Sequence, residues 1–254
     1  MMKVVLIGTG NVAKHLFNAL LKCDDIAVLE VVGRTTEKLS YFKQDTTINT
    51  NPKKIQDADI YIIVVSDDAI SAVSRHLIAK QGLVMHTSGS IPMEALSDVK
   101  RKGVFYPLQT FREGQKVNFK TIPICIEATQ ASDLAKMSLL ANAISDHVHE
   151  INSAQRKYLH LAAVFVNNFT NHMYHIGQEI CTTHQLPFSI LHPLLLETAE
   201  KIKEFSPYNV QTGPAKRKDK GTLEKQKALL ENDMHKNIYT LLSQSIQKTY
   251  GEKL

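Results

Sequence analysis

The chain of 254 residues is 43% hydrophobic and 22% charged, with a formal net charge of +5. This composition is typical of a globular protein with a sizeable core, and the length favours two domains over one. The mild charge is spread along the chain, which argues against a nucleic-acid-binding protein, whose basic residues usually form one dense patch. It suits small anionic ligands instead.

The three cysteines, Cys23, Cys125 and Cys181, are widely spaced and odd in number. They form neither a zinc-binding pattern nor a disulfide framework, so we expect no metal site and a reducing, cytoplasmic location. A strand-like run that begins at Lys3 leaves no room for a signal peptide. Residues 158–178 lack Asp, Glu, Lys and Arg, yet they carry several histidines and asparagines, so we expect a buried helix and not a membrane span.

Short apolar runs alternate with helical segments in the first 150 residues. Continuous apolar runs are expected of strands in a parallel sheet that helices cover on both faces. The predicted fold class is therefore α/β, a doubly wound and mostly parallel sheet of the Rossmann type. The predicted strands cover residues 3–8, 27–32, 60–65, 83–86, 103–106, 122–126 and 147–151, with helices at 12–22 and 132–145.

The pattern changes at Asn152. Asn152 followed by Gln155 resembles a capping box that opens a long helix. After it, prolines punctuate helical segments and no strand-like run follows. The sequence therefore predicts a nucleotide-binding domain at residues 1–152 and an all-α domain for substrate binding or dimerisation at residues 153–254.

A glycine-rich segment joins the first predicted strand to the first helix. Each of its positions has a physical role: Gly8 allows the tight turn, Gly10 lets the backbone approach a pyrophosphate, and Ala13 permits close packing. The N-terminus of the helix favours phosphate. This context predicts a dinucleotide site, and the alternative is a glycine turn without ligand. The segment reads Gly8-Thr9-Gly10-Asn11-Val12-Ala13.

The end of the second predicted strand selects between the two nicotinamide cofactors. Sites for NAD place an acidic residue there, whereas this chain has Arg34 and Thr35 after Gly33. Arg34 can pair with a 2′-phosphate and Thr35 can add a hydroxyl donor. Glu30 lies within the strand, too early to stand at its end. We therefore expect NADP(H), the alternative being a solvated surface arginine.

Polar side chains follow the next two strands. Ser66 and Asp67 come after the strand at 60–65, and the loop at 86–90 places Ser88 and Gly89 after the strand at 83–86. Ligands bind outside the carboxyl ends of such strands, so Ser66 and Asp67 are predicted to contact the cofactor and Ser88 to face the reacting groups. The alternative is that these residues cap helices or form a polar turn.

The charge-free helix supplies two catalytic candidates, His160 and Asn167. They stand seven residues apart, a spacing that returns to one face of an α-helix after two turns. A hydride that reaches a carbonyl carbon requires a proton for the oxygen, and imidazole, which titrates near neutral pH, suits that task. An asparagine amide can hold a carbonyl or a carboxylate. The alternative is that both residues satisfy core or dimer contacts.

These motifs support a resemblance that covers nearly the whole chain. The segments at 8–13 and 33–35 resemble the N-terminal domain of the superfamily of pyrroline-5-carboxylate reductase, 6-phosphogluconate dehydrogenase and deazaflavin-dependent NADP oxidoreductases. The segments at 86–90, 106–111 and 212–219 are similar to those of a bacterial family of Rossmann-like NADP oxidoreductases whose helical domain has no assigned function. The resemblance implies a dimer formed through the helical domain, and ketopantoate as a candidate substrate.

One departure from the superfamily concerns the proton donor. The related hydroxyacid dehydrogenases carry Lys and Asn four residues apart on this helix, whereas this chain has Ala163 before Asn167. His160 can replace the lysine, or the proton can come from the Ser88 loop or from water. The sequence thus predicts an NADP(H)-dependent oxidoreductase that reduces a small carbonyl or imine compound bearing a carboxylate. The alternative is a non-catalytic NADP(H) sensor.

Overall fold

The computed structural model describes residues 1–96 and 98–251. Its internal contacts divide the chain into two compact units, Met1–Phe165 and Val166–Leu254. The first unit contains the sheet and the first turns of the helix that begins after Asn152. The second unit is built from helices.

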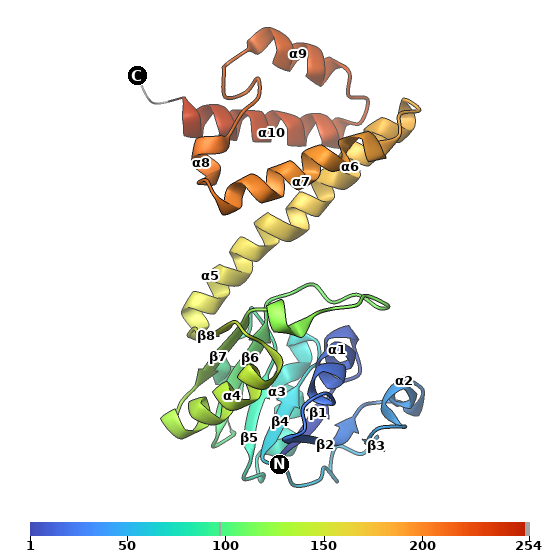
Figure 1. Ribbon diagram of the computed structural model, residues 1–254, viewed down its shortest axis with the longest axis vertical. Coiled ribbons are helices and arrows are strands. Elements are labelled where there is room, and N and C mark those ends of the chain that lie inside the picture. Colours follow the sequence, from blue (N-terminus) through green and yellow to red (C-terminus); the bar gives the residue numbers. More distant parts are fainter. Residues whose placement is uncertain (97, 252–254) are drawn as a thin grey trace. The chain divides into compact units, whose positions relative to one another are not determined.

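An eight-stranded sheet forms the centre of the first unit (Figure 1). Within the described residues its order is β3-β2-β1-β4-β5-β6-β7-β8, and all neighbouring strands are parallel except β6 and β7. The order 3-2-1-4-5-6 is that of a Rossmann sheet, so the predicted doubly wound, mostly parallel fold is confirmed. The strands are β1 (Met2–Ile7), β2 (Ile26–Val32), β3 (Thr47–Asn49), β4 (Ile60–Ile63), β5 (Leu83–His86), β6 (Lys102–Pro107), β7 (Ile124–Ala128) and β8 (Val148–Glu150).

The strand β3 was not predicted from the sequence. It has three residues, Thr47–Asn49, and lies at the edge of the sheet, where it pairs only with β2. Because it is short and largely polar, it carries no apolar run that would distinguish it from a loop. The antiparallel pairing of β6 with β7 could not be predicted from the sequence either. The relative direction of two strands depends on the path of the chain between them, and not on their residues.

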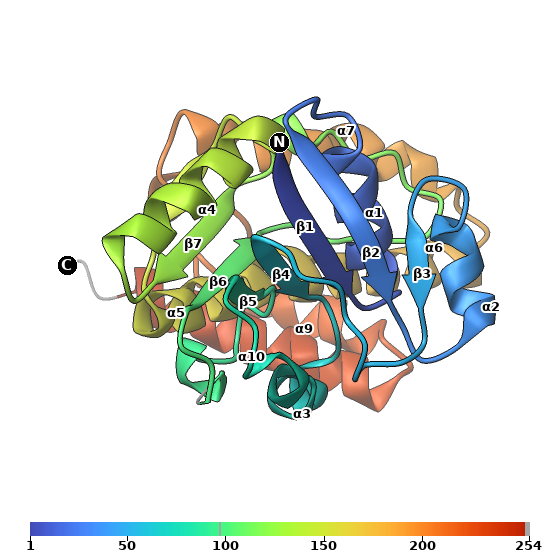
Figure 2. The same ribbon diagram turned by 90° about the horizontal axis from the view of Figure 1, so that it is seen from below.

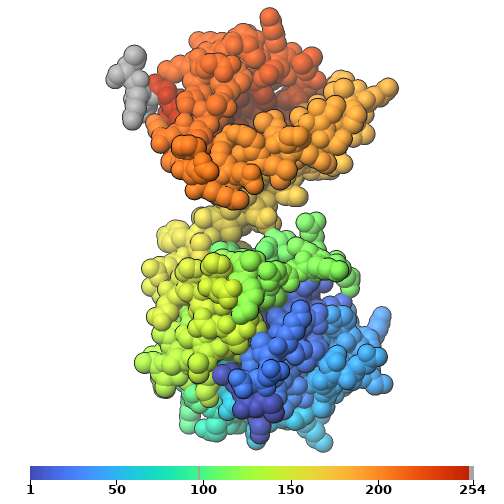
Figure 3. Space-filling view, viewed as in Figure 1, coloured from blue at the N-terminus to red at the C-terminus, as the bar shows by residue number. Residues whose placement is uncertain are grey.

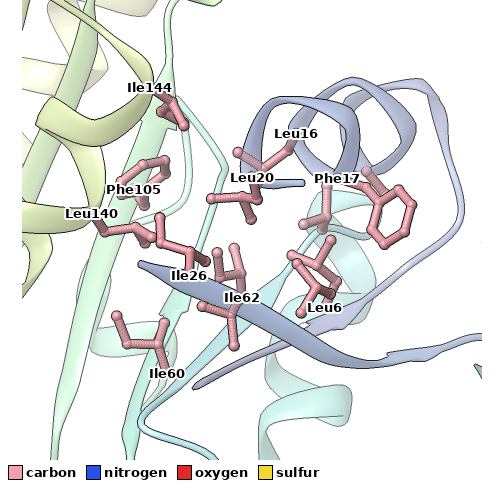
Figure 4. Close-up of a cluster of buried hydrophobic side chains, with 14 of the residues drawn as sticks. Leu6, Leu16, Phe17, Leu20, Ile26, Ile60, Ile62, Phe105, Leu140 and Ile144 are labelled. Carbon is pink, nitrogen blue, oxygen red and sulfur yellow. The ribbon is translucent and has the colours of Figure 1, made fainter. Parts of the chain in front are cut away.

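Alternate residues of the central strands pack on opposite faces of the sheet. Val4 and Leu6 contribute to one buried cluster, whereas Val5 and Ile7 contribute to the other. Helices α1 (Asn11–Leu20) and α4 (Ala131–Ile144) cover the first face, and the short α3 (Ile70–Ser74) lies on the second (Figure 2). Figure 4 shows the first cluster, in which side chains of α1 and α4 meet those of the sheet. Burial on both faces explains why the strands are continuously apolar.

The helix α5 (Ser153–Ala163) begins with the predicted capping box. The Asn152 side chain accepts a hydrogen bond from the Gln155 backbone, and the Gln155 side chain accepts one from the Asn152 backbone. A π-helical segment, Val164–Phe169, then leads into α6 (Thr170–Thr183). In the described residues after β8 there is no strand, in agreement with the predicted all-α domain. The other helices of the second unit are α7 (His192–Glu200), α8 (Pro207–Val210), α9 (Lys220–Ala228) and α10 (Asp233–Tyr250).

A helix that crosses a bilayer needs about 20 predominantly apolar residues. None of the helices in residues 1–96 and 98–251 could cross a membrane.

Candidate functional site

A cleft of about 1240 Å³ opens in the first unit, at the edge where the parallel strands end. The loops after β1, β2, β4 and β5 line it, together with side chains from α1 and α5. Because β1 and β4 are neighbours in the sheet but not in sequence, the crevice lies where doubly wound sheets bind ligands. The predicted site residues that line the cleft are Gly8, Thr9, Gly10, Asn11, Val12, Arg34, Ser66, Asp67, Ser88 and His160.

Gly8 joins β1 to the glycine-rich turn in a conformation that other residues rarely adopt. Its φ is +138°, and a Cβ atom there would lie 1.9 Å from the carbonyl oxygen of Val64. Its N–H donates to the carbonyl of Val32 over 2.8 Å. Gly8 therefore allows the ends of β1, β2 and β4 to pack closely at the base of the cleft.

Gly10 has a different role, because a Cβ atom there would meet no protein atom within 4 Å. It is the N-cap residue of α1, which has no side-chain cap and no acidic residue in its first turn. The N–H groups of that turn therefore face open space with a favourable helix dipole. These residues fit the pyrophosphate of a dinucleotide, as the sequence pattern predicts.

The end of β2 presents basic side chains to the cleft. Arg34 is exposed and lines the cleft, and so does Lys38, four residues later in α2 (Thr36–Leu39). Sequence reasoning missed Lys38, although its spacing from Arg34 corresponds to one helical turn. Thr35 is the N-cap residue of α2 and is not among the residues that line the cleft, so its contact with the cofactor stays a prediction. Glu30 is buried within β2, where it accepts a hydrogen bond from the Gln56 backbone.

The loops after β4 and β5 are linked by a hydrogen bond. The Ser90 hydroxyl donates to a carboxylate oxygen of Asp67 at 2.5 Å. The hydroxyl oxygen of Ser88 accepts from the N–H groups of Ser90, at 3.2 Å, and Ile91, at 3.0 Å. Ser88 thus stabilises the turn, which was the alternative interpretation of this residue. Its catalytic role stays a prediction.

His86, the last residue of β5, contacts the same loop through both ring nitrogens. Its Nδ1 accepts from the Ser88 N–H over 3.2 Å, and its Nε2 lies 3.4 Å from the Pro92 carbonyl. Burial, with a smaller contribution from the nearby Arg156 guanidinium, lowers the pKa of His86 to about 4. His86 is therefore neutral at physiological pH, and the two contacts assign its proton to Nε2.

His160 reaches the cleft from α5. Its Nδ1 lies 3.0 Å from the hydroxyl of Tyr106 at the end of β6. The loop after β5 also packs closely here, since a Cβ atom on Gly89 would lie 2.6 Å from His160 Nδ1. The sequence singled out the segments of Tyr106 and Gly89 but assigned no chemistry to either residue. Because Nδ1 is engaged, Nε2 is the nitrogen that can contact a ligand in the cleft.

Asn167 belongs to the second unit and lies in the π-helical segment Val164–Phe169. A face shared by Asn167 and His160 requires the period of an α-helix between them. A π-helix has a wider turn, so the seven-residue spacing does not return to the same face. The seven-residue spacing therefore no longer supports a shared face for Asn167 and His160. The role of Asn167 in orienting the substrate stays a prediction.

A buried ion pair anchors α5 beneath the loop of His86 and Gly89. Arg156 donates from Nη1 to Glu127 in β7 at 2.5 Å and from Nη2 to the Ile91 carbonyl at 2.7 Å. Glu127 also accepts from the backbone N–H and the hydroxyl of Ser153. Sequence reasoning did not find this network, because charged residues on a helix usually face solvent.

The loop of residues 108–118, between β6 and β7, lies against the first turns of α1 (Figure 3). Lys14 in α1 forms an ion pair with Glu113 of this loop at 2.8 Å. Asn11 donates to the Phe111 carbonyl at 3.5 Å. The loop thus borders the cleft beside the glycine-rich turn, and both Lys14 and Glu113 line the cleft.

The histidines of the second unit do not form a metal site. His172 and His175 have their ring centroids 6.1 Å apart, and His175 lies near Glu179. In residues 1–96 and 98–251, no group of three or more His, Cys, Asp or Glu side chains is arranged to hold a metal ion.

Comparison with known proteins places this geometry among nicotinamide-dependent enzymes. Residues 3–87 match the family model described as NADP oxidoreductase, coenzyme F420-dependent, and residues 122–246 match a domain of unknown function, DUF2520. No protein of curated function matches the chain.

Solved structures agree with this assignment. A candidate NADP oxidoreductase of Bacteroides fragilis is 38% identical, with a TM-score of 0.89 over 97% of this chain and 98% of that one. An imine reductase of Myxococcus stipitatus, in complex with NADP⁺, is 14% identical, with a TM-score of 0.70 over 98% and 94%. A pyrroline-5-carboxylate reductase of Coxiella burnetii is 15% identical, with a TM-score of 0.61 over 99% and 94%. The last two show the fold alone.

These matches confirm the predicted cofactor, NADP(H), and the predicted class of activity. The family assignment rests on both halves of the chain. One family model covers β1 to β5 of the Rossmann sheet, and the other extends from β7 into α10. The chain therefore belongs to the family of NADP oxidoreductases in which a Rossmann domain precedes a helical domain of unknown function.

Proposed function

We propose that this oxidoreductase uses NADPH to reduce a small carbonyl or imine compound that carries a carboxylate. The observation that carries the proposal is the position of His160, whose imidazole lines the same cleft as the glycine-rich loop. Its Nδ1 is bonded to the Tyr106 hydroxyl, which leaves Nε2 as the ring nitrogen for a ligand. The cleft therefore combines a dinucleotide cradle with a group that can carry a proton.

When bound, NADPH supplies a hydride to the carbon of a C=O or C=N group. The oxygen or nitrogen then needs a proton, and His160 provides it from Nε2. His160 takes the place of the lysine that Ala163 rules out. The loop of Ser88 and Gly89 lines the same cleft as His160, which supports a place for the reacting groups between them. Asn167 stays the predicted partner of the substrate carboxylate, since its amide holds an anion without titrating.

The choice of substrates to test follows from the fold and from the resemblance. An imine reductase and a pyrroline-5-carboxylate reductase share this fold, which supports testing cyclic imines beside 2-keto acids. Ketopantoate is the first keto acid to test, because some members of the family that the sequence resembles are associated with its reduction.

The experiment follows NADPH absorbance with a panel of keto acids and imines, using the wild-type protein and the His160→Gln variant. We expect turnover of at least one carboxylate-bearing compound and a loss of roughly 100-fold or more in kcat in the variant. His149→Gln is the matched control, since His149 is exposed in β8 and does not line the cleft. Normal turnover of the His160 variant would refute the assignment. Tight NADPH binding without turnover across the panel would favour the non-catalytic sensor.

We also propose that the second unit forms a homodimer. Several large apolar side chains of its helices are exposed in the single chain, more than solubility alone favours. They include Ile190, Leu194, Leu196 and Leu241, and Leu186 in the loop after α6 is exposed as well. Light scattering tests the proposal: a dimer is expected, and Leu194→Glu combined with Leu241→Glu should yield a monomer.

A cytoplasmic location belongs to the same proposal. Cys23, Cys125 and Cys181 are all free thiols, which supports a reducing compartment. Fractionation of cells that express the tagged protein tests the location.

A further inference from the structure

Tyr106 and Gly89 enclose one edge of the His160 ring. The Tyr106 hydroxyl lies 3.0 Å from His160 Nδ1, and the two rings meet edge to face, with centroids 6.0 Å apart and an interplanar angle of 69°. A Cβ atom on Gly89 would lie 2.6 Å from Nδ1 and 2.9 Å from the Tyr106 hydroxyl. The backbone at Gly89 therefore packs against this edge too closely to leave room for a side chain.

Three separate elements meet at this point. Tyr106 comes from the end of β6, Gly89 from the loop after β5, and His160 from α5. Arg156, one turn earlier on the same face of α5, binds the Ile91 carbonyl and Glu127 and so ties α5 to that loop and to β7. The imidazole is thus held by its ring partner and by the anchored helix that carries it.

The hydroxyl of Tyr106 is suited to a fixed hydrogen bond and not to supplying the proton. Burial, with a smaller contribution from Cys125, raises the pKa of Tyr106 to about 12, and the Arg156 guanidinium opposes this only in part. Tyr106 therefore keeps its proton throughout the physiological range. A hydroxyl can accept from an Nδ1–H or donate to a bare Nδ1, so it can bond to the ring in either protonation state.

We propose that Tyr106 is a positioning residue that holds His160 by Nδ1, so that Nε2 alone is presented to the substrate, and that Gly89 is required for this contact. The inference rests on the proposed role of His160 as proton donor. The Nε2–H bond of the imidazolium breaks as an O–H or N–H bond forms on the reduced substrate. Nδ1 keeps its proton and its bond to the Tyr106 hydroxyl. No proton leaves Tyr106.

The test uses Tyr106→Phe, which keeps the ring and removes the hydroxyl. We expect kcat to fall roughly tenfold, with KM and the Kd for NADPH unchanged within about twofold, because ground-state binding does not involve this bond. Nitrogen NMR of the His160 ring provides a readout that needs no substrate: the wild-type ring should show a hydrogen-bonded Nδ1, and the variant a free one. Tyr158→Phe is the matched control, since Tyr158 is 72% exposed on the same helix.

A second variant approaches the same contact from the loop. Gly89→Ala places a methyl group against Nδ1 and should break the bond, with the same NMR change and a similar fall in kcat. The proposal is overturned if Tyr106→Phe keeps full kcat, or if kcat falls while the His160 nitrogen signals stay unchanged. If His160→Gln retains turnover, the proposed function fails. If only the Tyr106 variant is fully active, the proposed function stands and this inference fails.

Discussion

Arg156 and Glu127 form a buried ion pair that joins α5 to β7, with Nη1 and Oε2 2.5 Å apart. The Arg156 side chain is only 1% exposed, and it also binds the Ile91 carbonyl in the loop after β5. Breaking such a pair leaves a buried charge without compensation, which is costly even where the intact pair adds little net stability. The pair therefore fixes the helix that carries His160 to β7.

Glu127→Gln should destabilise the protein by about 3 kcal/mol, because it leaves the Arg156 charge buried and unpaired. Urea unfolding at neutral pH measures the change. The control is Glu197→Gln, which removes the exposed α7 partner of Lys201, the residue that follows α7, and should cost less than about 1 kcal/mol. Equal effects of the two substitutions would contradict the role of the buried pair.

His86 should make stability fall as the pH falls from about 6.5 towards 4. Its folded-state pKa is lowered to about 4, whereas in the unfolded chain it is about 6.5. In that window the unfolded chain binds a proton that the folded protein does not, so the free energy of unfolding rises with pH. The contribution of His86 to the free energy of unfolding is therefore fully present above about pH 6.5. It is lost progressively as the pH falls towards the folded-state pKa of about 4.

The measurement is urea unfolding at pH 7 and pH 5 for the wild type and for His86→Asn, which keeps an acceptor for the Ser88 N–H. The wild type should lose about 2 kcal/mol more than the variant between these two conditions. His149→Asn is the control, because His149 is exposed. A variant with the pH dependence of the wild type would show that another group is responsible.

Arg34→Ala should weaken NADPH binding by roughly 10- to 100-fold, the range expected when charge-assisted hydrogen bonds to a phosphate are lost. Binding of NADH, which lacks the 2′-phosphate, should change little. Calorimetric titration with both nucleotides measures the difference. Lys43→Ala is the control, since Lys43 is a nearby exposed cation outside the cleft. An equal loss for NADPH and NADH would argue against contact with the 2′-phosphate.

The two glycines of the nucleotide loop should respond differently to alanine. Gly10→Ala should leave the free energy of unfolding within about 1 kcal/mol of the wild type, because the new methyl group meets no protein atom within 4 Å. It should weaken NADPH binding by roughly tenfold or more, since the methyl group occupies the approach of the pyrophosphate.

Gly8→Ala should instead destabilise the fold by more than about 2 kcal/mol, since its Cβ would lie 1.9 Å from the Val64 carbonyl oxygen. Thermal unfolding and calorimetric titration of the two variants separate the effects. Unchanged NADPH binding in Gly10→Ala would contradict the proposed cradle.

The sequence by itself determined the fold class and the class of cofactor, NADP(H). Buried parallel strands must be apolar on both faces, so β1, β4 and β5 were visible as continuous runs. The glycine-rich turn and the end of β2 are local features, in which neighbouring residues in sequence are also neighbours in space. For that reason Gly8, Gly10 and Arg34 could be placed at the carboxyl ends of β1 and β2 before the fold was known.

Only the tertiary structure decided the surroundings of the catalytic candidates. Tyr106 and His160 are 54 residues apart, and Glu127 and Arg156 are 29 apart, so no local spacing could reveal either contact. The π-helical segment at Val164–Phe169 altered the period on which the pairing of His160 with Asn167 depended. Contacts between side chains of different strands and helices depend on the path of the whole chain. The periodicity of residues along one helix or strand cannot specify such contacts.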